Sequence, residues 1–489
     1  MAVNSIDFLL FFAVVFIVYY LPFVKNRPKL QTAWLLTANV AFYAIAELKM
    51  LPLLLGVVLV YYYIGLFLKT EMMKRNAKRA SVITTVGVTL GILLLFYFKY
   101  LNFFVESFAS FLSGIGLNAT WTTLNVVLPL GVSFFTFKLI SYVIEIHREH
   151  IEPCRSLTDF AAYVTFFPTI MAGPIDRPNG FIPQMGKGRS LDYHLAVDGL
   201  RQILWGMFTK MCIADNLAQS TDFVWNDVGG QTPSTLLYVA LLFPVQMYAD
   251  FDGYSNMAIG VGKLLGFRIT RNFNHPFLAR NVADYWLRWH ISLTSFITDY
   301  VFMPLNIAFR DKGKLGISLA VVINLVVIGL WHGANWTYAM FGLYHGLLFL
   351  PLIYANKFGR MKKLKANKIG LPKMADFIQM VLTYGLVAIG LIIFMAPSLS
   401  SLSAFVNGLF SKSILSFPHP HLGQASSYVS TYLFVVMLFV MEWWSRDNEY
   451  ALQQVFPRSR VLRWATYYAV LLSVYFFAAA NQEFIYVRF

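Results

Sequence analysis

The sequence is poor in charged residues and has almost no cysteine. Only 13% of its 489 residues are charged, whereas a typical soluble domain has about 25%. A soluble chain of this length would fold as roughly three domains, and there are too few charges here to cover their surfaces. Cys154 and Cys212 are too few for a disulfide framework or a four-ligand zinc site. These shortages exclude a soluble enzyme, a disordered chain and a disulfide scaffold.

Apolar residues are abundant instead: 58% of the chain is hydrophobic and 17% is aromatic. A membrane-spanning helix needs about 20 apolar residues. Apolar runs of that order lie at about 6–24, 30–46, 50–68, 81–98, 123–145, 194–214, 235–262, 315–331, 335–356, 374–396, 427–445 and 464–480. The stretches 101–117, 157–185 and 284–308 are apolar but interrupted by Pro, Gly or charge, which indicates interfacial or re-entrant helices. We therefore predict an all-α integral membrane protein with about eleven to thirteen membrane-embedded helices.

The net charge of +15 would suggest a nucleic-acid partner in a soluble chain. In membrane proteins, however, Lys and Arg collect in cytoplasmic loops, so we predict no nucleic-acid partner. Placing the basic clusters Lys69–Arg79, Lys357–Lys368 and Arg446–Arg463 in the cytoplasm puts both termini outside, together with Pro397–Ser426. No internal repeat is visible, which argues against an inverted-repeat transporter.

Of two motifs typical of soluble enzymes, one is incomplete and the other is absent. The segment Gly260–Lys263 reads Gly-Val-Gly-Lys, but no Ser or Thr follows the Lys and the outer glycine spacing is wrong for a phosphate loop. No Gly-x-Ser-x-Gly elbow is present, so a covalent serine hydrolase has no support.

Ionisable residues at membrane depth are costly and are therefore functional candidates. The first cluster of such residues lies in Gln246–Asn256. If this segment is helical, Asp250 and Tyr254 share a face at i, i+4, while Asp252 points away. The alternative is a polar contact between two helices.

The second cluster begins at Asp284. On a continuous helix Trp286, Trp289 and His290 share one face. Arg288 lies off that face and is placed to pair with Asp284 at i, i+4. The alternative is an aromatic and basic anchor at the lipid headgroups.

The third cluster is Trp331-His332-Gly333, at the end of an apolar run. A lone histidine on an apolar helix is usually a packed core residue, but the glycine after His332 lets a second group approach. His345 follows 13 residues later, which on one helix is roughly 20 Å and about 220° away. The two therefore cannot act on one atom unless the chain breaks at Gly333. His290 lies on a different segment and can meet His332.

These motifs resemble those of the membrane-bound O-acyltransferase (MBOAT) family. The segment Arg288–Leu293 is followed by Trp331-His332-Gly333, forty-two residues after His290, and then by Tyr344-His345-Gly346. Further matches are Leu128–Phe137, Phe167–Pro174, Asp252–Ser255 and Phe484–Tyr486. The chain is most similar to the bacterial branch that holds the alginate O-acetyltransferase membrane subunit and the D-alanyl transfer protein of teichoic acid synthesis. The resemblance covers about residues 85–489.

The resemblance implies a ring of tilted transmembrane and re-entrant helices around a thinned centre. Within a single domain over 1–489, it implies N-terminal helices in 1–122, a catalytic core in 123–356 and C-terminal helices in 357–489. An outer funnel and a cytoplasmic pocket are expected to meet near the family's histidines. By position, His332 matches the principal catalytic histidine and His290 matches the second histidine of this branch.

Acyl transfer from a thioester needs an oxygen nucleophile, a base and stabilisation of the developing oxyanion. Histidine suits the base, and a thiolate leaves readily, so no metal is required. We expect His332 to activate an incoming hydroxyl group and His290 to orient the thioester or stabilise charge. The expected supporting or substrate-binding residues are Trp289, Arg288, Trp286, Asn335, Tyr254, Asp250 and Asp252.

The implied function is an acyl relay across the inner (cytoplasmic) membrane, from acetyl-CoA or an acyl carrier protein to an exported or cell-envelope polysaccharide. No bound cofactor is expected. The expected partner is an extracytoplasmic SGNH-type acetyltransferase. Three alternatives stay open: D-alanyl transfer from a carrier protein to teichoic-type polymers, a transporter in which Asp250, Asp252 and His332 relay protons, and a scaffold that only holds a partner.

Overall fold

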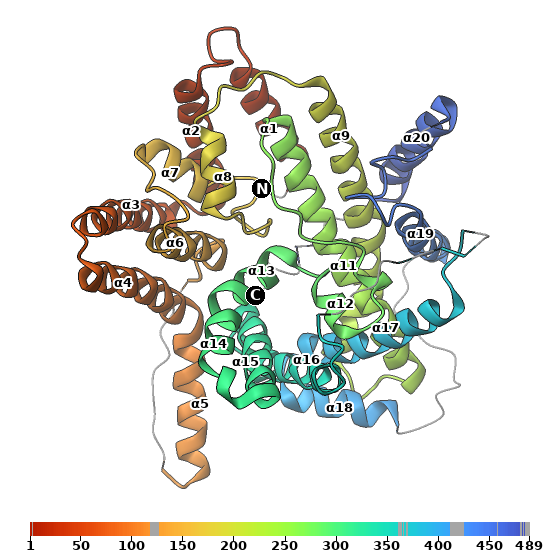
Figure 1. Cartoon of the computed structure of the whole chain (residues 1–489). Helices are drawn as coiled ribbons and strands as arrows, with labels where there is room; N and C mark the ends of the chain where they lie inside the picture. Colours follow the sequence, from red (N-terminus) through yellow and green to blue (C-terminus); the bar gives the residue numbers. More distant parts are fainter. Residues whose placement is uncertain are drawn as a thin grey trace. The chain divides into compact units, whose positions relative to one another are not determined.

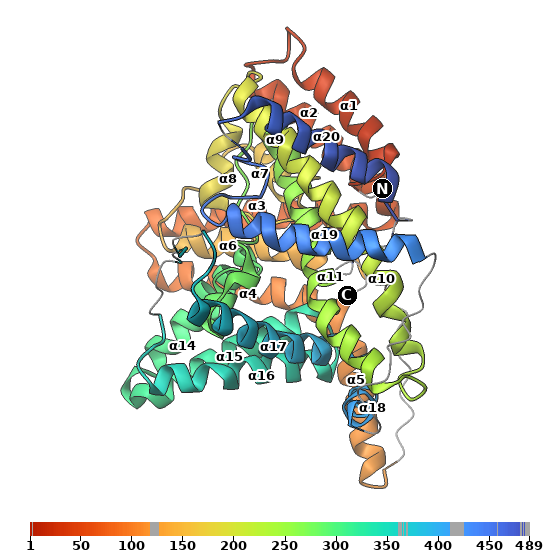
Figure 2. The same ribbon diagram turned by 90° about the vertical axis from the view of Figure 1, so that its right-hand side faces the viewer.

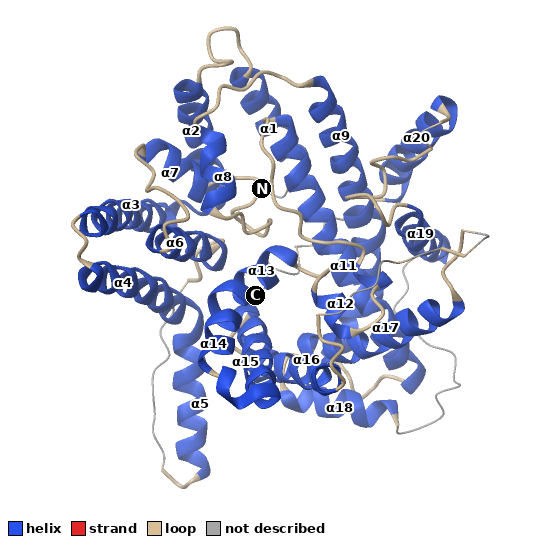
Figure 3. Ribbon diagram, in the orientation of Figure 1, coloured by secondary structure: helices blue, strands red, loops and turns tan. Residues whose placement is uncertain are grey.

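The computed structural model describes residues 1, 3–117, 127–359, 364, 366–367, 370–410, 425–456, 458–479, 482 and 484. Within these ranges the regular structure is helical, and the β-type pairing is limited to one isolated bridge between Ala366 and Pro372. Figure 3 shows helices joined by loops. The predicted all-α class is confirmed.

Seven segments of the described chain are long and apolar enough to cross a membrane. They are Pro28–Met73, Ala77–Gly114, Pro233–Leu264, Ile291–Ala308, Arg310–His332, Trp336–Tyr354 and Met374–Met395. This number is below the eleven to thirteen expected, in part because Pro28–Met73 combines two of the predicted runs. In addition, the apolar helices Ile6–Tyr19, Leu399–Leu409 and Val429–Trp444 are shorter than these seven segments and are not counted among them. The chain is a multi-pass membrane protein.

The segment 101–117 is not the interrupted stretch that we expected. Helix α4 (Ala77–Leu95) continues through the π-helical turn η2 (Phe96–Tyr100) into α5 (Leu101–Gly114). No proline or glycine lies between Gly91 and Gly114, so the backbone contains none of the residues that usually break a helix.

Contacts between backbone positions divide the chain into two compact units, and each is described by itself. The first is Met1–Ile203 with Met257–Thr270, and the second is Leu204–Asn256 with Arg271–Phe489. Helices α9 (Tyr193–Met207) and α11 (Pro233–Leu264) contribute residues to both. The single domain over 1–489, with its internal boundaries, stays a prediction. The predicted cytoplasmic residues Arg360, Lys362, Lys363, Lys365 and Lys368, and the predicted external segment His419-Pro420-His421, lie outside the described residues.

The first unit joins its helices through buried side-chain amides. Besides α4, η2 and α5 it contains α1 (Ile6–Tyr19), α2 (Pro28–Glu47), η1 (Leu48–Met50), α3 (Leu51–Met73), α6 (Val132–His147), α7 (Leu157–Val164) and α8 (Pro178–Met185). Asn39 on α2 donates to the carbonyl of Ala162 at 3.1 Å and accepts from the backbone N–H of Phe167 at 3.0 Å. This bond fixes the start of the motif Phe167–Pro174.

Gly131 brings two of the matched motifs together in the first unit. Its φ of 68° is in the left-handed region, and a Cβ atom there would lie 2.1 Å from the carbonyl oxygen of Ile170. Both the backbone conformation and the close approach require glycine. The motif Leu128–Phe137 is therefore a packing motif at this position.

The second unit contains η3 (Phe208–Ala214), α10 (Asp215–Thr221), η4 (Asp222–Asn226), most of α11, η5 (Pro276–Leu278), α12 (Val282–Trp286), α13 (Ile291–Ile297), η6 (Thr298–Phe302), α14 (Met303–Ala308), η7 (Arg310–Lys312), α15 (Gly313–His332), α16 (Trp336–Tyr354), α17 (Met374–Met395), α18 (Leu399–Leu409), α19 (Ala425–Trp444) and α20 (Arg460–Phe477). The region 284–308 is interrupted, as predicted, because α12 ends at Trp286 and α13 begins only at Ile291. Helices α15 and α16 form an antiparallel hairpin, and α17 packs beside α16 (Figures 1 and 2). The turn of this hairpin follows His332 directly.

Candidate functional site

His290 and His332 lie side by side in the second unit. Their ring centroids are 6.3 Å apart, and both side chains are buried. His290 directly precedes α13, and His332 is the last residue of α15. At this separation an oxygen atom between the rings can hydrogen bond to both of them. The expectation that these two histidines can meet is confirmed.

The chain reaches His290 through a broken helix. Helix α12 ends at Trp286, and α13 begins at Ile291. Between them His290 has a φ of 45°, a left-handed conformation that costs a non-glycine residue roughly 1–2 kcal/mol. The prediction that Trp286, Trp289 and His290 share one helical face is therefore wrong, because the backbone changes direction between the tryptophans and the start of α13.

Asn272 supplies the hydrogen bonds that the start of α13 needs. Its carbonyl oxygen accepts from the N–H of Ile291 at 2.8 Å. Its side-chain Oδ1 accepts from the N–H of Ser292 at 3.4 Å and from the Ser292 hydroxyl at 2.7 Å. The same oxygen lies 3.1 Å from Nδ1 of His290. Asn272 is not among the predicted residues, because a single asparagine in an irregular loop carries no periodic signal.

His332 ends its helix because the chain becomes extended at Gly333. Asn335 then caps α16: its Oδ1 accepts from the N–H of Thr337 at 3.1 Å, and its Nδ2 donates to the carbonyl of Pro397 at 2.7 Å. We expected Asn335 to be a supporting or substrate-binding residue near the histidines. The structure engages both ends of its amide in the helix cap and the neighbouring chain, and its role in the site stays a prediction.

The break at Gly333 folds His345 back toward His332, but two phenylalanines lie between them. The ring of His332 is 5.0 Å from that of Phe394, which is 5.2 Å from Phe341, which in turn is 4.8 Å from His345. The predicted site residue Trp286 lies on the His345 side, where its indole N–H donates to Nδ1 of His345 at 3.3 Å. Trp286 and His345 thus form a separate pair.

Arg288 and Trp289 hold the turn that precedes His290. Nε of Arg288 is 2.6 Å from Oδ1 of Asp284, which confirms the predicted i, i+4 pair. The guanidinium also donates to the carbonyl of Asn274 at 3.1 Å. The Trp289 ring stacks on Tyr285 with centroids 5.4 Å apart. Both side chains support the turn, which is consistent with the supporting role predicted for them.

Asp250 on α11 forms a buried ion pair. Its carboxylate lies 2.5 Å from Nζ of Lys210, which is also 2.7 Å from a carboxylate oxygen of Asp215. All three side chains are buried. Lys210 and Asp215 are not among the predicted residues, because they lie in the π-helical turn η3 and at its end, where a helical period of 3.6 does not apply. The ion pair gives Asp250 a structural role. This agrees with the alternative considered above, a polar contact between two helices.

Tyr254 and Asp252 lie on different faces of α11, as predicted. Tyr254 follows Asp250 by one helical turn, and its ring packs edge-on against Phe484 at 4.7 Å. Nζ of Lys210 lies 4.3 Å from the centroid of the same Phe484 ring. The Asp252 carboxylate instead accepts from the amide of Asn256 at 2.8 Å. Asp250 and Tyr254 therefore share the face that meets the C-terminal segment of the chain.

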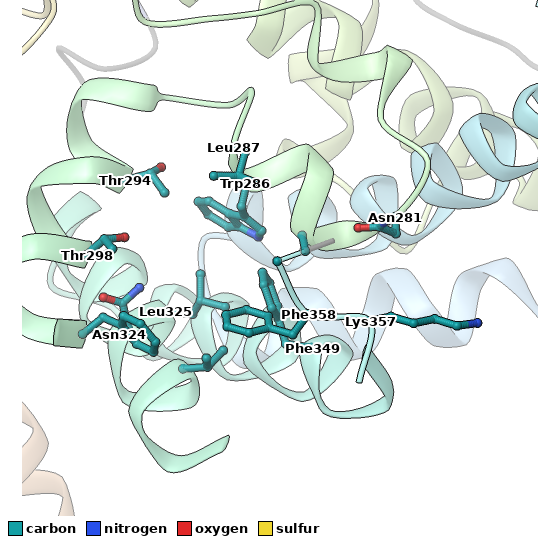
Figure 4. A pocket seen from close by; sticks show the side chains of 14 residues that line it. Asn281, Trp286, Leu287, Thr294, Thr298, Asn324, Leu325, Phe349, Lys357 and Phe358 are labelled. Atoms are coloured by element: carbon teal, nitrogen blue, oxygen red, sulfur yellow. The ribbon is translucent and has the colours of Figure 1, made fainter. Parts of the chain in front are cut away.

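A cavity of about 200 Å³ opens beside α13. Its lining combines aromatic and aliphatic side chains with four neutral polar ones, Asn281, Thr294, Thr298 and Asn324. In Figure 4 Thr294, Thr298 and Asn324 lie along one side of the cavity, with Trp286 and Phe349 facing it from other elements. The hydroxyl of Thr294 donates to the carbonyl of His290 at 3.1 Å, so the cavity lies one helical turn from that histidine. Oδ1 of Asn324 is buried, and no described residue forms a hydrogen bond with it.

Comparison with known proteins identifies a family whose model matches this chain. Residues 147–387 match the model of the membrane-bound O-acyltransferase family, MBOAT. This range contains both site histidines, the turn before His290 and the α15–α16 hairpin.

Three named relatives show what the chain is similar to. The "Probable alginate O-acetylase AlgI" of Pseudomonas putida is 34% identical over 414 residues, which is 84% of this chain and 80% of that protein. The "Peptidoglycan O-acetyltransferase" of Helicobacter pylori is 28% identical over 98% of this chain and 95% of its own length. The "Teichoic acid D-alanyltransferase" of Bacillus subtilis is 30% identical over 55% of this chain and 69% of its own length.

Proposed function

The chain belongs to the membrane-bound O-acyltransferase family, and from this premise we propose that it relays acetyl groups from acetyl-CoA across the inner membrane. The acceptor is a hydroxyl group, either of the polysaccharide or of a partner protein. The final product is an O-acetylated exported or cell-envelope polysaccharide. The observation that carries the proposal is the buried pair His290 and His332, with ring centroids 6.3 Å apart. Relatives named as O-acetylating enzymes align over 84–98% of the chain, and the named D-alanyltransferase aligns over 55%. This difference favours acetyl over D-alanyl transfer.

In the proposed reaction His332 acts as the general base. It takes the proton of the acceptor hydroxyl while the hydroxyl oxygen attacks the thioester carbonyl carbon. The C–S bond then breaks, and the thiolate of coenzyme A leaves and receives the proton from His332. One ester bond replaces one thioester bond, so the reaction balances without a redox partner. Burial of both histidines excludes the water that would otherwise hydrolyse the thioester.

We propose that the cavity beside α13 admits the slender arm of the acetyl thioester donor. The arm is mostly apolar and carries amide groups, which match a lining of aromatic side chains with Thr294, Thr298 and Asn324. Asn324 belongs to this lining, and its side-chain amide can hydrogen bond to an amide group of the donor arm. Lys357 also belongs to the lining, and its side chain extends away from the cavity in Figure 4. A phosphate of the donor can meet it there.

The acceptor side faces outward in this proposal. The positive-inside rule places the basic loops in the cytoplasm, where acetyl-CoA is made, so the acceptor approaches from the opposite face. The expected partner is an extracytoplasmic SGNH-type acetyltransferase, whose own hydroxyl or bound glycan receives the acetyl group.

The test uses the full chain in inverted membrane vesicles, which expose the cytoplasmic face. Acetyl-CoA labelled in the acetyl group is supplied, and alkali-labile label in the polysaccharide or partner fraction is measured. We expect label with the wild type and background with His332→Ala at equal protein level. Transfer of D-alanine from a charged carrier protein, without acetyl transfer, would replace this proposal by the D-alanyl alternative.

A further inference from the structure

We infer that Asn272 is a positioning residue that fixes the tautomer of His290, so that the neutral imidazole presents the lone pair of Nε2 to the substrate. This inference rests on the proposed function only for its consequence, because the tautomer itself can be measured without any reaction.

The orientation of that amide follows from a backbone donor. The side-chain atom of Asn272 that faces Ser292 lies 3.4 Å from the backbone N–H of Ser292, and a backbone N–H can only donate. That atom must therefore be the oxygen Oδ1 rather than the nitrogen. The other end of the amide, Nδ2, donates to the hydroxyl of Ser255 on α11 at 3.2 Å. The Ser255 hydroxyl can accept or donate, so this contact is compatible with that orientation, and the backbone N–H of Ser292 is the group that selects it.

The tautomer of His290 follows from the amide. Oδ1 of Asn272 is an acceptor and lies 3.1 Å from Nδ1 of His290, so Nδ1 must carry the proton. In a neutral imidazole the other nitrogen, Nε2, then has a lone pair and no proton. Burial favours the neutral form and lowers the pKa of His290 to about 3.

The consequence concerns the division of labour between the two histidines. A neutral His290 with a bare Nε2 has no N–H to donate to the thioester oxyanion. Instead it binds a group of the substrate that donates an O–H or N–H, such as a hydroxyl of the acceptor or an amide of the donor arm. Stabilisation of the oxyanion then falls to another donor. This narrows our expectation from sequence, which left both roles open to His290.

The left-handed backbone of His290 supports a positioning role. The N-cap residue of a helix usually bonds the exposed N–H groups with its own side chain, but here Asn272 accepts both from Ile291 and from Ser292. The imidazole of His290 is thereby released from capping. Its ring instead packs against Phe251, with centroids 4.6 Å apart, and beside His332.

The first experiment measures the tautomer directly. The full chain is labelled with ¹⁵N-histidine and reconstituted in lipid, and the His290 signals are assigned by their loss in His290→Gln. We expect wild-type His290 to carry its proton on Nδ1 at pH 7.5, and Asn272→Ala to give a mixture of tautomers. A proton on Nε2 in the wild type, or an unchanged tautomer in Asn272→Ala, would overturn the inference whether or not the chain transfers acetyl groups.

The second experiment separates positioning from folding. Asn272→Asp keeps an acceptor for Nδ1–H, so it should retain the tautomer and restore transfer relative to Asn272→Ala. The new carboxylate should also raise the pKa of His290 and move the acidic limb of the pH profile upward. Asn272→Ala should lower kcat at least tenfold with little change in KM, since a wrong histidine tautomer costs up to about 10⁴ in a serine protease.

Ser255→Ala is the matched control. It removes the other hydrogen bond of the Asn272 side chain but leaves the contact with His290 in place. We expect it to keep the tautomer and at least half of the wild-type kcat. A merely structural role for Asn272 would give equal losses in Asn272→Asp and Asn272→Ala, with the tautomer of His290 unchanged in both.

Discussion

The indole N–H of Trp286 donates to Nδ1 of His345 at 3.3 Å. This bond makes His345 an acceptor at Nδ1, so its other nitrogen, Nε2, carries the proton in the neutral ring. Nε2 faces α17, where a Cβ atom on Gly390 would lie only 2.3 Å away. The Trp286–His345 pair is therefore enclosed by α12, α16 and α17, which favours a packing role for a histidine inside the matched Tyr344-His345-Gly346 motif.

Gly390→Ala should destabilise the protein by displacing the His345 ring. Overpacking of a buried site typically costs about 1–3 kcal/mol. Gly385 lies on the same helix with no heavy atom of a neighbour within 4 Å of an added Cβ, so Gly385→Ala is the matched control. Thermal unfolding in detergent should show a lower Tm for Gly390→Ala and an unchanged or higher Tm for Gly385→Ala. Equal Tm values for the two variants would contradict the close packing at His345.

The two histidines of the α15–α16 hairpin should differ in activity. His332→Gln should lower acetyl transfer by about 10²–10⁴, the usual contribution of a general base. His345→Gln keeps a side-chain acceptor for the Trp286 indole and should retain most of the transfer. The assay is polymer-linked acetyl ester at equal protein level in the membrane. Loss of transfer in His345→Gln with normal stability would require a direct role for that histidine.

The sequence allowed the helical class, the pairing of Arg288 with Asp284 and the approach of His290 to His332 to be predicted. Each depends on a local period or on matched motif order. The shared face predicted for Trp286 and His290 was wrong, because a left-handed residue between two short helices leaves no periodic signal in the sequence. Asn272 was missed for a related reason: its contact joins an irregular loop to a helix start 18–20 residues later.

Stability should depend on pH through His290. Burial holds its pKa at about 3 in the folded protein, against about 6.5 in an unfolded chain. The unfolded state therefore takes up a proton below pH 6.5 and the folded state does not, so stability is complete above pH 6.5 and falls toward pH 3. At pH 5 the loss is about 2 kcal/mol. The Tm of the wild type should thus fall relative to that of His290→Gln between pH 7.5 and pH 5, and parallel Tm curves would refute a buried neutral His290.

Asn324 should affect donor binding rather than the chemical step. Asn324→Leu has a similar volume but no side-chain amide to hydrogen bond to the donor arm. Loss of one neutral hydrogen bond costs about 0.5–1.5 kcal/mol, so KM for acetyl-CoA should rise about two- to tenfold with kcat nearly unchanged. Thr298→Val, in the same cavity lining, serves as a variant of similar size. A fall in kcat at constant KM would place Asn324 outside the donor site.

A variant without thiols should retain full acetyl transfer, because neither cysteine is placed to carry the acetyl group. Cys154 is buried in the loop between α6 and α7, and burial raises the pKa of its thiol to about 11. Its Sγ donates to the carbonyl of Ser156 at 3.3 Å. Cys212 is fully buried in η3. A buried thiol that keeps its proton is a poor nucleophile.

The double variant Cys154→Ala, Cys212→Ala should therefore match the wild type in transfer of labelled acetyl groups at equal protein level, with His332→Ala as the inactive reference. Incubation of the wild type with labelled donor and no acceptor should leave the protein unlabelled after denaturation, because in the proposed mechanism the acetyl group passes directly to the acceptor hydroxyl. An acetyl adduct on Cys212 or His332 that is chased into product on addition of acceptor would replace direct transfer by a covalent relay. Loss of transfer in the double variant without such an adduct would instead point to a packing role, which a parallel fall in Tm would reveal.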